Sequence, residues 1–270
     1  MAATVTFLSD YGYEDEYVGI CHAVIARIAP DARVIDLGHG VPRHDIAHGA
    51  AVLANALPYT PAGVHLAVVD PGVGSTRKAV AVRTTDAPRV LVGPDNGLLG
   101  RAIDCFGGAA EAVDVSLSPA RLKPVSATFH GRDVFAPVAA HLALGEDLSS
   151  LGDPLAAGEL TRLEVPAAGI EPGVRAEASV LDVDRFGNVA LELGGDELLE
   201  SGLKLGRPVR VEARGLALDA VYALTFADVP ANGLLVYLDS FGRLALAVNR
   251  GSAAERLQVG RGDRVVVLPA

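Results

Sequence analysis

Apolar residues in the first part of the chain occur in short runs that alternate with longer stretches of helical spacing. Short runs bounded by turn residues are typical of buried strands, whereas apolar positions repeated every three or four residues predict helices. The pattern predicts strands at about 4–8, 33–37, 64–69, 78–83, 90–93 and 111–115, and helices at about 17–28, 46–57, 98–106 and 134–144. Strands that alternate with helices predict βαβ units and a mostly parallel sheet.

The pattern changes near residue 165, and helical spacing nearly disappears beyond it. Residues 165–173 are rich in Pro, Ala and Gly, which predicts a linker. Short strand-like runs then follow at 174–183, 189–193, 208–213, 234–238, 244–248 and 263–268. This spacing is typical of a small antiparallel barrel or sandwich. We therefore predict an N-terminal α/β domain over residues 1–164 and a smaller C-terminal β domain over residues 174–270.

Composition narrows the classes of function. The chain has 270 residues and a formal net charge of −10. This negative charge argues against binding to the phosphate backbone of nucleic acids. Apolar runs are too short to span a membrane, and the N-terminus has a strand pattern where a signal peptide would have an apolar core. We expect a soluble, cytoplasmic protein without nucleic-acid or membrane partners. Cys21 and Cys105 form no disulfide framework.

Two acidic residues follow predicted strands. Asp70 ends the apolar run 64–69, and a glycine-rich turn over residues 72–76 separates it from Arg77. Asp10 ends the first predicted strand in the same way. Open α/β sheets bind ligands at the carboxyl ends of their strands, so both carboxylates are candidates for a binding site. The alternative is a strand-to-strand turn that the Asp side chain caps.

Among the seven histidines, His130 stands out because it lies in a polar glycine-containing loop just before a predicted helix. The alternative is a structural loop histidine held by Asp133. His44 and His48 have the spacing of metal ligands on a helix, but without a third clear ligand the pattern favours a helix start with surface histidines. Motifs for a serine nucleophile or a P-loop are absent, which argues against covalent serine chemistry and a kinase.

Six segments in fixed order carry a resemblance to a known family. They are VVDPGVGSTR, GPDNGLL, TFHGRDVFAP, DRFGN, TFADV and LDSFGRLALAVNRGSAA. Together they resemble the S-adenosyl-L-methionine (SAM) hydroxide adenosyltransferases, or SAM hydrolases, which are related to the fluorinase and chlorinase. The resemblance covers almost the whole chain. It implies an α/β N-terminal domain and a C-terminal antiparallel β-barrel, in agreement with the hydrophobic pattern.

The resemblance also implies roles for individual residues. Asp70, Arg77 and His130 match the family's water-activating residues, and Asp10 matches the acid that binds the ribose hydroxyls. Asp184 and Asn188 match family residues that hold the amino group of methionine, and Ser240 matches a residue at its carboxylate. Phe186 and Phe226 match aromatic residues around the adenine, and the loop 249–254 matches the segment that offers backbone groups to it. Relatives often continue FGN with Thr-Asn, where this chain has Val189-Ala190. Family members form trimers whose sites lie between subunits, so a homotrimer is expected.

The implied reaction is hydrolysis of SAM to adenosine and L-methionine by attack of activated water at C5′. SAM is then the substrate, and no cofactor is expected. The sulfonium leaves as a neutral thioether that needs no proton, so the reaction needs no general acid and no metal. One alternative is a halogenase, although those relatives carry Tyr where this chain has Asp70 and lack the histidine of the FHGRD loop. The other is a non-catalytic module that binds SAM or adenosine.

Overall fold

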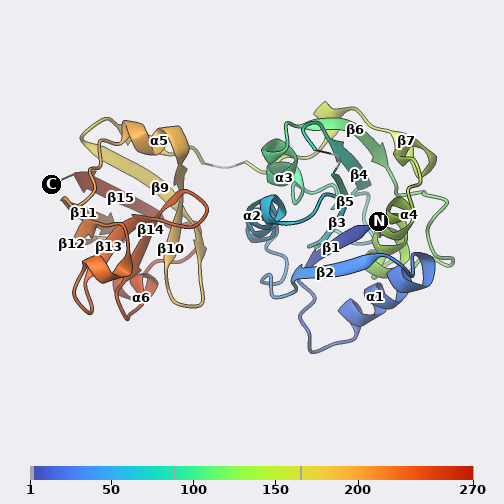
Figure 1. Cartoon of the computed structure of the whole chain (residues 1–270), viewed down its shortest axis with the longest axis horizontal. Coiled ribbons are helices and arrows are strands. Elements are labelled where there is room, and N and C mark those ends of the chain that lie inside the picture. The colour runs from blue at the N-terminus through green and yellow to red at the C-terminus, as the bar shows by residue number, and fades with distance from the viewer. Residues whose placement is uncertain (1–2, 88, 165, 270) are drawn as a thin grey trace. The chain divides into compact units, whose positions relative to one another are not determined.

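The computed structural model describes residues 3–87, 89–164 and 166–269. Its residues group into two compact units, Met1–Leu163 and Glu164–Ala270 (Figure 1). Within the described residues, no helix has both the length and the apolar character that crossing a membrane would require. The predicted linker 165–173 begins at Val165, which lies outside the described residues, and it contains the short strand β8 (Gly169–Glu171).

A seven-stranded sheet forms the centre of the N-terminal unit (Figure 1). Four adjacent strands are parallel, in the order β2 (Arg33–Gly38), β1 (Thr4–Ser9), β3 (Val64–Val68) and β5 (Val90–Pro94). The sheet continues with β4 (Ala79–Thr84), β6 (Ala109–Asp114) and β7 (Asp153–Pro154), each antiparallel to its neighbour, so β6 again runs in the direction of the parallel strands. The carboxyl ends of the parallel strands therefore meet at one edge of the sheet.

Helices cover both faces of this sheet. Val5 and Phe7 of β1 contribute to one core with α1 (Tyr17–Ile28) and α4 (Ala136–Ala143), whereas Leu8 joins a second core with α2 (Ile46–Ala56) and α3 (Gly100–Cys105). Burial on both faces explains why the parallel strands are continuous apolar runs. The predicted helix 134–144 starts earlier than expected, with a π-helical turn η2 (Gly131–Phe135), and the predicted helix 98–106 is shorter.

Short 3₁₀ turns complete the N-terminal unit. They are η1 (Leu57–Tyr59), η3 (Leu148–Ser150) and η4 (Ala157–Glu159).

The C-terminal unit is a closed barrel. Its strands follow the order β10 (Val189–Gly194), β14 (Arg243–Val248), β13 (Leu234–Leu238), β12 (Leu216–Tyr222), β11 (Pro208–Ala213), β15 (Arg264–Pro269) and β9 (Arg175–Val183), and pairing of β9 with β10 closes the ring. Closure removes the exposed edges that an open sheet would leave. Strand β8 adds to β9, and the unit also holds α5 (Gly195–Glu200), η5 (Phe226–Asp228) and α6 (Ala253–Leu257).

The predicted fold class, an α/β domain with a mostly parallel sheet followed by a smaller β-barrel, is confirmed. Among the described strands of the barrel, β12 and β13 form a parallel pair, and the other neighbouring strands pair antiparallel. The chain between these two strands passes through η5 instead of a hairpin turn, so β13 runs in the direction of β12. The hydrophobic pattern does not predict β12, whose exposed face carries Ala217 and Asp219.

Candidate active site

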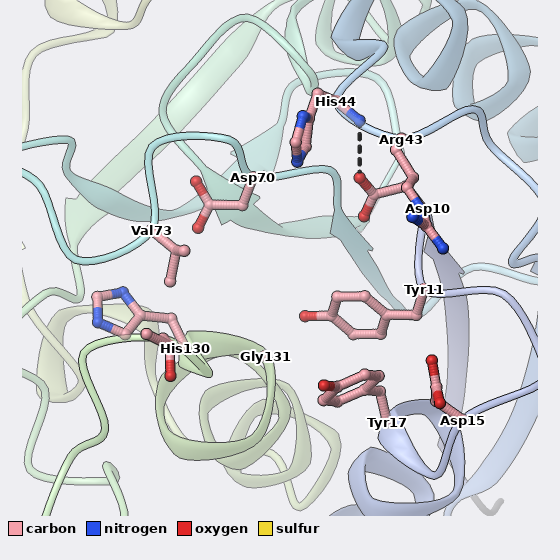
Figure 2. A pocket seen from close by; sticks show the side chains of 11 residues that line it. Asp10, Tyr11, Asp15, Tyr17, Arg43, His44, Asp70, Val73, His130 and Gly131 are labelled. Carbon is pink, nitrogen blue, oxygen red and sulfur yellow. Dashed lines mark hydrogen bonds between the residues drawn. The ribbon is translucent and has the colours of Figure 1, made fainter.

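Asp10 and Asp70 lie at the same edge of the sheet because each follows one of the neighbouring parallel strands β1 and β3. The backbone N–H of Asp10 donates to the carbonyl of Val68 at 3.4 Å, which holds the two strand ends together. A pocket of about 350 Å³ opens at this edge. It is lined by Asp10, Tyr11, Asp15, Tyr17, Arg43, His44, Asp70, Val73, Thr128, His130 and Gly131 (Figure 2).

The pocket has two chemically different ends (Figure 2). Asp70 and His130 lie with Val73 at one end, and Asp10 lies with Arg43 at the other. One carboxylate oxygen of Asp10 accepts the backbone N–H of His44 at 3.0 Å. The second oxygen, and the remaining lone pairs of both, leave room for donors from a ligand.

His44 and His48 do not form the helical pair that their spacing would allow. The helix α2 begins at Ile46, after His44, and Asp45 caps it by accepting the backbone N–H of His48 at 2.9 Å. His44 lies before the helix with a positive φ of 66° and lines the pocket. The structure thus confirms the predicted helix start.

Asp70 and Arg77 form a buried, two-pronged ion pair. Arg77 donates from Nε to Oδ1 at 3.0 Å and from Nη2 to Oδ2, and the two side chains are 6% and 8% exposed. The same guanidinium donates to the Lys78 carbonyl and lies over the Phe135 ring. These contacts fix the cation in one place, because a guanidinium presents its donors in a rigid fork.

The turn between Asp70 and Arg77 also brings the His130 loop to this ion pair. Gly74 has a φ of +77°, and a Cβ at this position would overlap the carbonyl oxygen of Ala127. Only glycine therefore fits this close approach of the two loops. On the other side, buried Asp133 accepts the backbone N–H of Ser126 at 2.8 Å and two donors from Arg132, which holds the loop in shape.

His130 completes a cluster of three with this ion pair. Its Nδ1 lies 3.3 Å from Nη2 of Arg77. A guanidinium only donates, so Nδ1 carries a lone pair and the neutral ring holds its proton on Nε2. Burial, and then the charge of Arg77, lower the pKa of His130, which favours the neutral ring. Burial raises the pKa of Asp70 in spite of Arg77. The cluster thus combines a carboxylate, a fixed cation and a neutral imidazole.

Tyr11 lies between the two ends, and its hydroxyl points toward Asp70 and His130 (Figure 2). Burial raises its pKa well above the ordinary value, so the hydroxyl stays protonated and is available as a donor. The ring packs edge-on against Phe7 and Phe129. Its oxygen lies so close to Gly131 that a Cβ there would overlap it.

We expect Gly131→Ala to reduce kcat/KM by at least about tenfold, because the added methyl group displaces the Tyr11 hydroxyl and misplacement by about 1 Å at a reacting centre is costly. Steady-state kinetics with SAM, the substrate that the family resemblance implies, measure the effect. The matched control is Gly158→Ala, since a Cβ at Gly158 meets no atom within 4 Å. Unchanged kinetics of Gly131→Ala would remove Tyr11 from the account of the site.

A second cavity, of about 180 Å³, is also lined by His130. Its lining includes Arg77, Arg121 and His130, with Ser75 and Ser116. His130 lines both this cavity and the main pocket, so the imidazole forms part of the wall between them. Arg121 also lowers the pKa of His130, although by less than burial and Arg77 do.

Two predicted ligand residues of the C-terminal unit, Phe226 and Asp184, lie near Tyr237. Its ring lies 5.2 Å from that of Phe226, and its pKa is raised to about 12 by burial first and then by the charges of Asp184 and Asp239. Asp239 precedes Ser240 in the turn between β13 and β14. Sequence analysis missed Tyr237, because it lies inside a strand pattern that reads as ordinary barrel core.

Asp184 shapes the turn that holds Phe186 and Asn188. Its carboxylate accepts the backbone N–H groups of both, at 2.8 and 2.9 Å, and the Asn188 amide at 2.7 Å. The carbonyl of Gly187 accepts the N–H groups of Ala253 and Ala254, so the loop 249–254 lies against this turn. Phe186 is 69% exposed, and Phe226 and Phe241 are exposed as well.

Comparison with known proteins decides which family shares this arrangement. Residues 5–152 match the SAM hydroxide adenosyltransferase N-terminal domain, and residues 178–266 match the SAM hydroxide adenosyltransferase C-terminal domain. The chain belongs to the SAM hydroxide adenosyltransferase family.

Curated relatives of this chain include SAM hydrolases and fluorinases by name. The chain is 51% identical to an "(R)-S-adenosyl-L-methionine hydrolase" of Salinispora arenicola over 99% of both chains. It is 44% identical to a protein of the same name from Thermus thermophilus, over 98% of this chain and 99% of that protein. A "Fluorinase" of Actinopolyspora mzabensis is 29% identical over 97% of this chain and 96% of that protein. A solved structure of an uncharacterised conserved protein from Thermotoga maritima superposes with a TM-score of 0.91 at 38% identity, over 98% of this chain and 99% of that one.

The structure brings predicted site residues together within each unit. Asp10, Asp70 and His130 line one pocket, and Arg77 pairs with Asp70. Sequence analysis missed the remaining polar lining, which comprises Tyr11, Asp15, Tyr17, Arg43, His44 and Thr128. Their position in the sequence could have indicated some of them. Tyr11 directly follows Asp10, and Arg43 and His44 follow β2, the strand beside β1 in the sheet.

Proposed function

We propose that this chain hydrolyses SAM to adenosine and L-methionine by attack of water on C5′. The observation that carries the proposal is the cluster of Asp70, Arg77 and His130 at one end of a pocket whose other end holds Asp10. Relatives at 44–51% identity are named for hydrolysis of the (R) epimer of SAM, so we assign the same epimer to this chain.

Asp10 is the proposed ribose ligand. A carboxylate accepts hydrogen bonds only, and its two oxygens have the spacing to accept both ribose hydroxyls. The His44 N–H already occupies one lone pair and fixes the orientation of the carboxylate. This end of the pocket thus places C5′ toward Asp70 and His130.

The proposed ligands of the adenine and methionine groups come from the C-terminal unit. Phe186 and Phe226 offer exposed rings to adenine, and Asp184, Asn188 and Ser240 offer polar groups to methionine. Oδ2 of Asp184 accepts a single donor within the turn, the Asn188 amide, and so keeps acceptor capacity for an ammonium group.

The chemical step is an in-line displacement. The bond between water oxygen and C5′ forms while the C5′–S bond breaks, and its electron pair goes to sulfur, which leaves as the neutral thioether of methionine. Water has a pKa near 15.7, and a neighbouring cation lowers a pKa by about 1–3 units, so Arg77 alone leaves the water protonated. A base is therefore required.

His130 is the proposed base. Its Nδ1 lone pair faces Arg77 at 3.3 Å, a long contact that an incoming water proton displaces easily. Asp70 orients the water and balances the charge of Arg77. The proton then leaves His130 through the second cavity that it lines. A base of this kind contributes about 10²–10⁴ to the rate.

The pH dependence of kcat/KM follows from the two shifted groups. Turnover needs neutral His130, whose pKa is lowered, and ionised Asp70, whose pKa is raised. We expect activity to persist below pH 6.5, the ordinary value for histidine, and to fall only at more acidic pH. In Arg77→Gln both pKa values rise, because Arg77 lowers each of them, so the acidic limb moves to higher pH.

A pH profile of kcat/KM measures this shift. Lys78→Gln is the matched control, because it removes the cation next to Arg77 in the sequence and leaves the cluster intact. The Lys78 ammonium group is exposed and lies 3.7 Å from the Glu159 carboxylate. An acidic limb that stays in place in Arg77→Gln would contradict the assigned coupling.

Product analysis tests the hydrolase proposal against a halogenase. Purified protein is incubated with each epimer of SAM, with and without chloride, and nucleosides are separated and identified by mass spectrometry. The buried carboxylate of Asp70 would repel a halide, so we expect adenosine and no 5′-chlorinated nucleoside. A chlorinated product would establish a halogenase, and bound SAM without product would establish a binding module.

A homotrimer in the cytoplasm is the proposed working form. The exposed Phe186, Phe226 and Phe241 support an assembly in which a ligand or another subunit covers these rings. SAM, adenosine and methionine are its proposed small-molecule partners. Light scattering coupled to size-exclusion chromatography tests the trimer, and the mass of a monomer would contradict it.

A further inference from the structure

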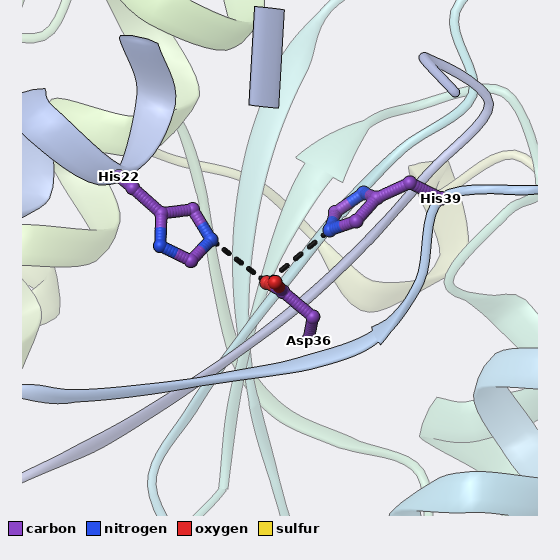
Figure 3. Close-up of side chains that lie close together, drawn as sticks. All are labelled: His22, Asp36 and His39. Atoms are coloured by element: carbon purple, nitrogen blue, oxygen red, sulfur yellow. Dashed lines mark hydrogen bonds and ion pairs between the residues drawn. The ribbon is translucent and has the colours of Figure 1, made fainter. Parts of the chain in front are cut away.

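Two histidines and an aspartate converge on one point outside the pocket (Figure 3). His22 lies on α1, Asp36 lies on β2, and His39 follows β2 in the chain. The Nε2 atoms of His22 and His39 lie 2.8 and 3.2 Å from the same oxygen of Asp36. All three candidate ligand atoms are within 4.8 Å of one another.

His39 is the buried member, with 1% of its surface exposed. Its Nδ1 lies 2.7 Å from Oγ of buried Ser9. Its Nε2 is shielded from solvent, and none of the described residues forms an aligned hydrogen bond with it. The His39 ring has two neutral forms. When Ser9 donates to Nδ1, the Nε2–H faces Asp36; when Nδ1–H donates to Ser9, the Nε2 lone pair faces the Asp36 carboxylate at 3.2 Å, which is the form that can bind a cation between them.

We propose that His22, Asp36 and His39 form a binding site for a transition-metal dication of the Zn²⁺ class. Imidazole nitrogen and carboxylate oxygen are ligands that suit Zn²⁺, and three protein ligands leave a fourth position for water. Tetrahedral bonds of about 2.0–2.1 Å place neighbouring ligand atoms about 3.3 Å apart. The separation of His39 and Asp36 agrees with this value, and the partly exposed His22 side chain lies on the accessible side of the cluster.

The surroundings of the cluster have the features of a metal site. Ser9 bonded to the distal nitrogen of His39 is the kind of outer partner that fixes the orientation of a metal-ligating histidine. His22 and Asp36 are both partly exposed, which gives an ion an entry path. None of its three ligands lines the pocket, so the ion would not contact the substrate.

A bound ion would brace the segment that carries Asp10. The carbonyl of His39 accepts the N–H of Gly12 at 2.7 Å, and the ring of Tyr13 packs edge-on against His39. Metal binding would thus tie together α1, β2 and the loop after β1. The proposed role is structural: the ion holds the ribose end of the pocket in place.

Calorimetric titration with Zn²⁺ tests the site on the full chain without a histidine tag, after treatment with a chelator. We expect one Zn²⁺ per chain and, with Co²⁺, the visible absorption bands of tetrahedral coordination. His22→Asn and Asp36→Asn each remove a ligand and should weaken Zn²⁺ binding at least about 100-fold, because losing an outer partner alone costs about 10–100-fold. His141→Asn is the matched control, since His141 pairs with a single carboxylate, Glu146, at 2.6 Å.

Proton NMR of the wild-type chain gives a readout that needs no variant. Zn²⁺ should shift the imidazole signals of His22 and His39 and leave that of His141 in place. Absence of stoichiometric binding by the wild type, or equal affinity in His22→Asn, would overturn the proposal. Either result leaves the hydrolase proposal unaffected, because the products of SAM are measured separately.

Discussion

Replacing His130 with alanine is expected to lower kcat by a factor of about 10²–10⁴ while SAM still binds. The variant loses the lone pair that accepts the proton of the attacking water, and Arg77 alone leaves that water protonated. Asp10, the proposed ribose ligand, stays in place at the other end of the pocket. Steady-state kinetics and calorimetric titration with SAM separate the loss of turnover from any loss of binding.

His141→Ala provides the control for removal of a histidine. His141 lies on α4 of the same unit and pairs with Glu146, and it does not line the pocket. Its variant should keep the kcat of the wild type. A His130→Ala variant that retains kcat within twofold would remove His130 from the chemical step.

Asp70→Asn is expected to reduce both turnover and stability. The change leaves the buried Arg77 guanidinium without its carboxylate, and an amide NH₂ replaces one of the two acceptor oxygens. Breaking a buried ion pair by removing one partner costs about 3–5 kcal/mol. Urea denaturation measures the free energy of unfolding, and kinetics with SAM should show a loss of kcat comparable to that of His130→Ala.

Asp104→Asn is the matched control for the loss of an ion pair. Asp104 pairs with Arg162 at 2.6 Å on the surface of the same unit, where the side chains are 63% and 45% exposed. A pair of this kind contributes about 0–1 kcal/mol, so the control should change stability little. Equal stability losses in the two variants would show that the Asp70 pair is no more than a surface contact.

The sequence predicts the frame of the site because strand ends have strong local signals. The apolar run before Asp70 ends just before Pro71, and the run before Asp10 ends in the polar Ser9, so both carboxylates are assigned to strand ends. Neighbouring parallel strands then place them together, as the pairing of β1 and β3 shows. The hydrophobic pattern alone thus locates two carboxylates of the pocket, Asp10 and Asp70.

His130 could be connected to Asp70 only through the family resemblance. The contact depends on the close approach of Gly74 to Ala127, two residues whose sequence neighbourhoods give no sign of each other. Tyr11 is a similar case, because its position depends on the missing side chain of Gly131. In the barrel, Tyr237 reads as one more apolar position of β13. Long-range packing at glycines decides these positions, and local periodicity carries no information about it.

Isotopic labelling tests the central claim, attack of activated water on C5′, most directly. SAM is converted by the purified chain in ¹⁸O-labelled water, and both products are analysed by mass spectrometry. The account predicts one ¹⁸O atom in adenosine, at its 5′-oxygen, and none in methionine. Adenosine without label, or label in a fragment of the methionine chain, would show that the C5′–S bond is not broken by water at C5′ and would contradict the mechanism.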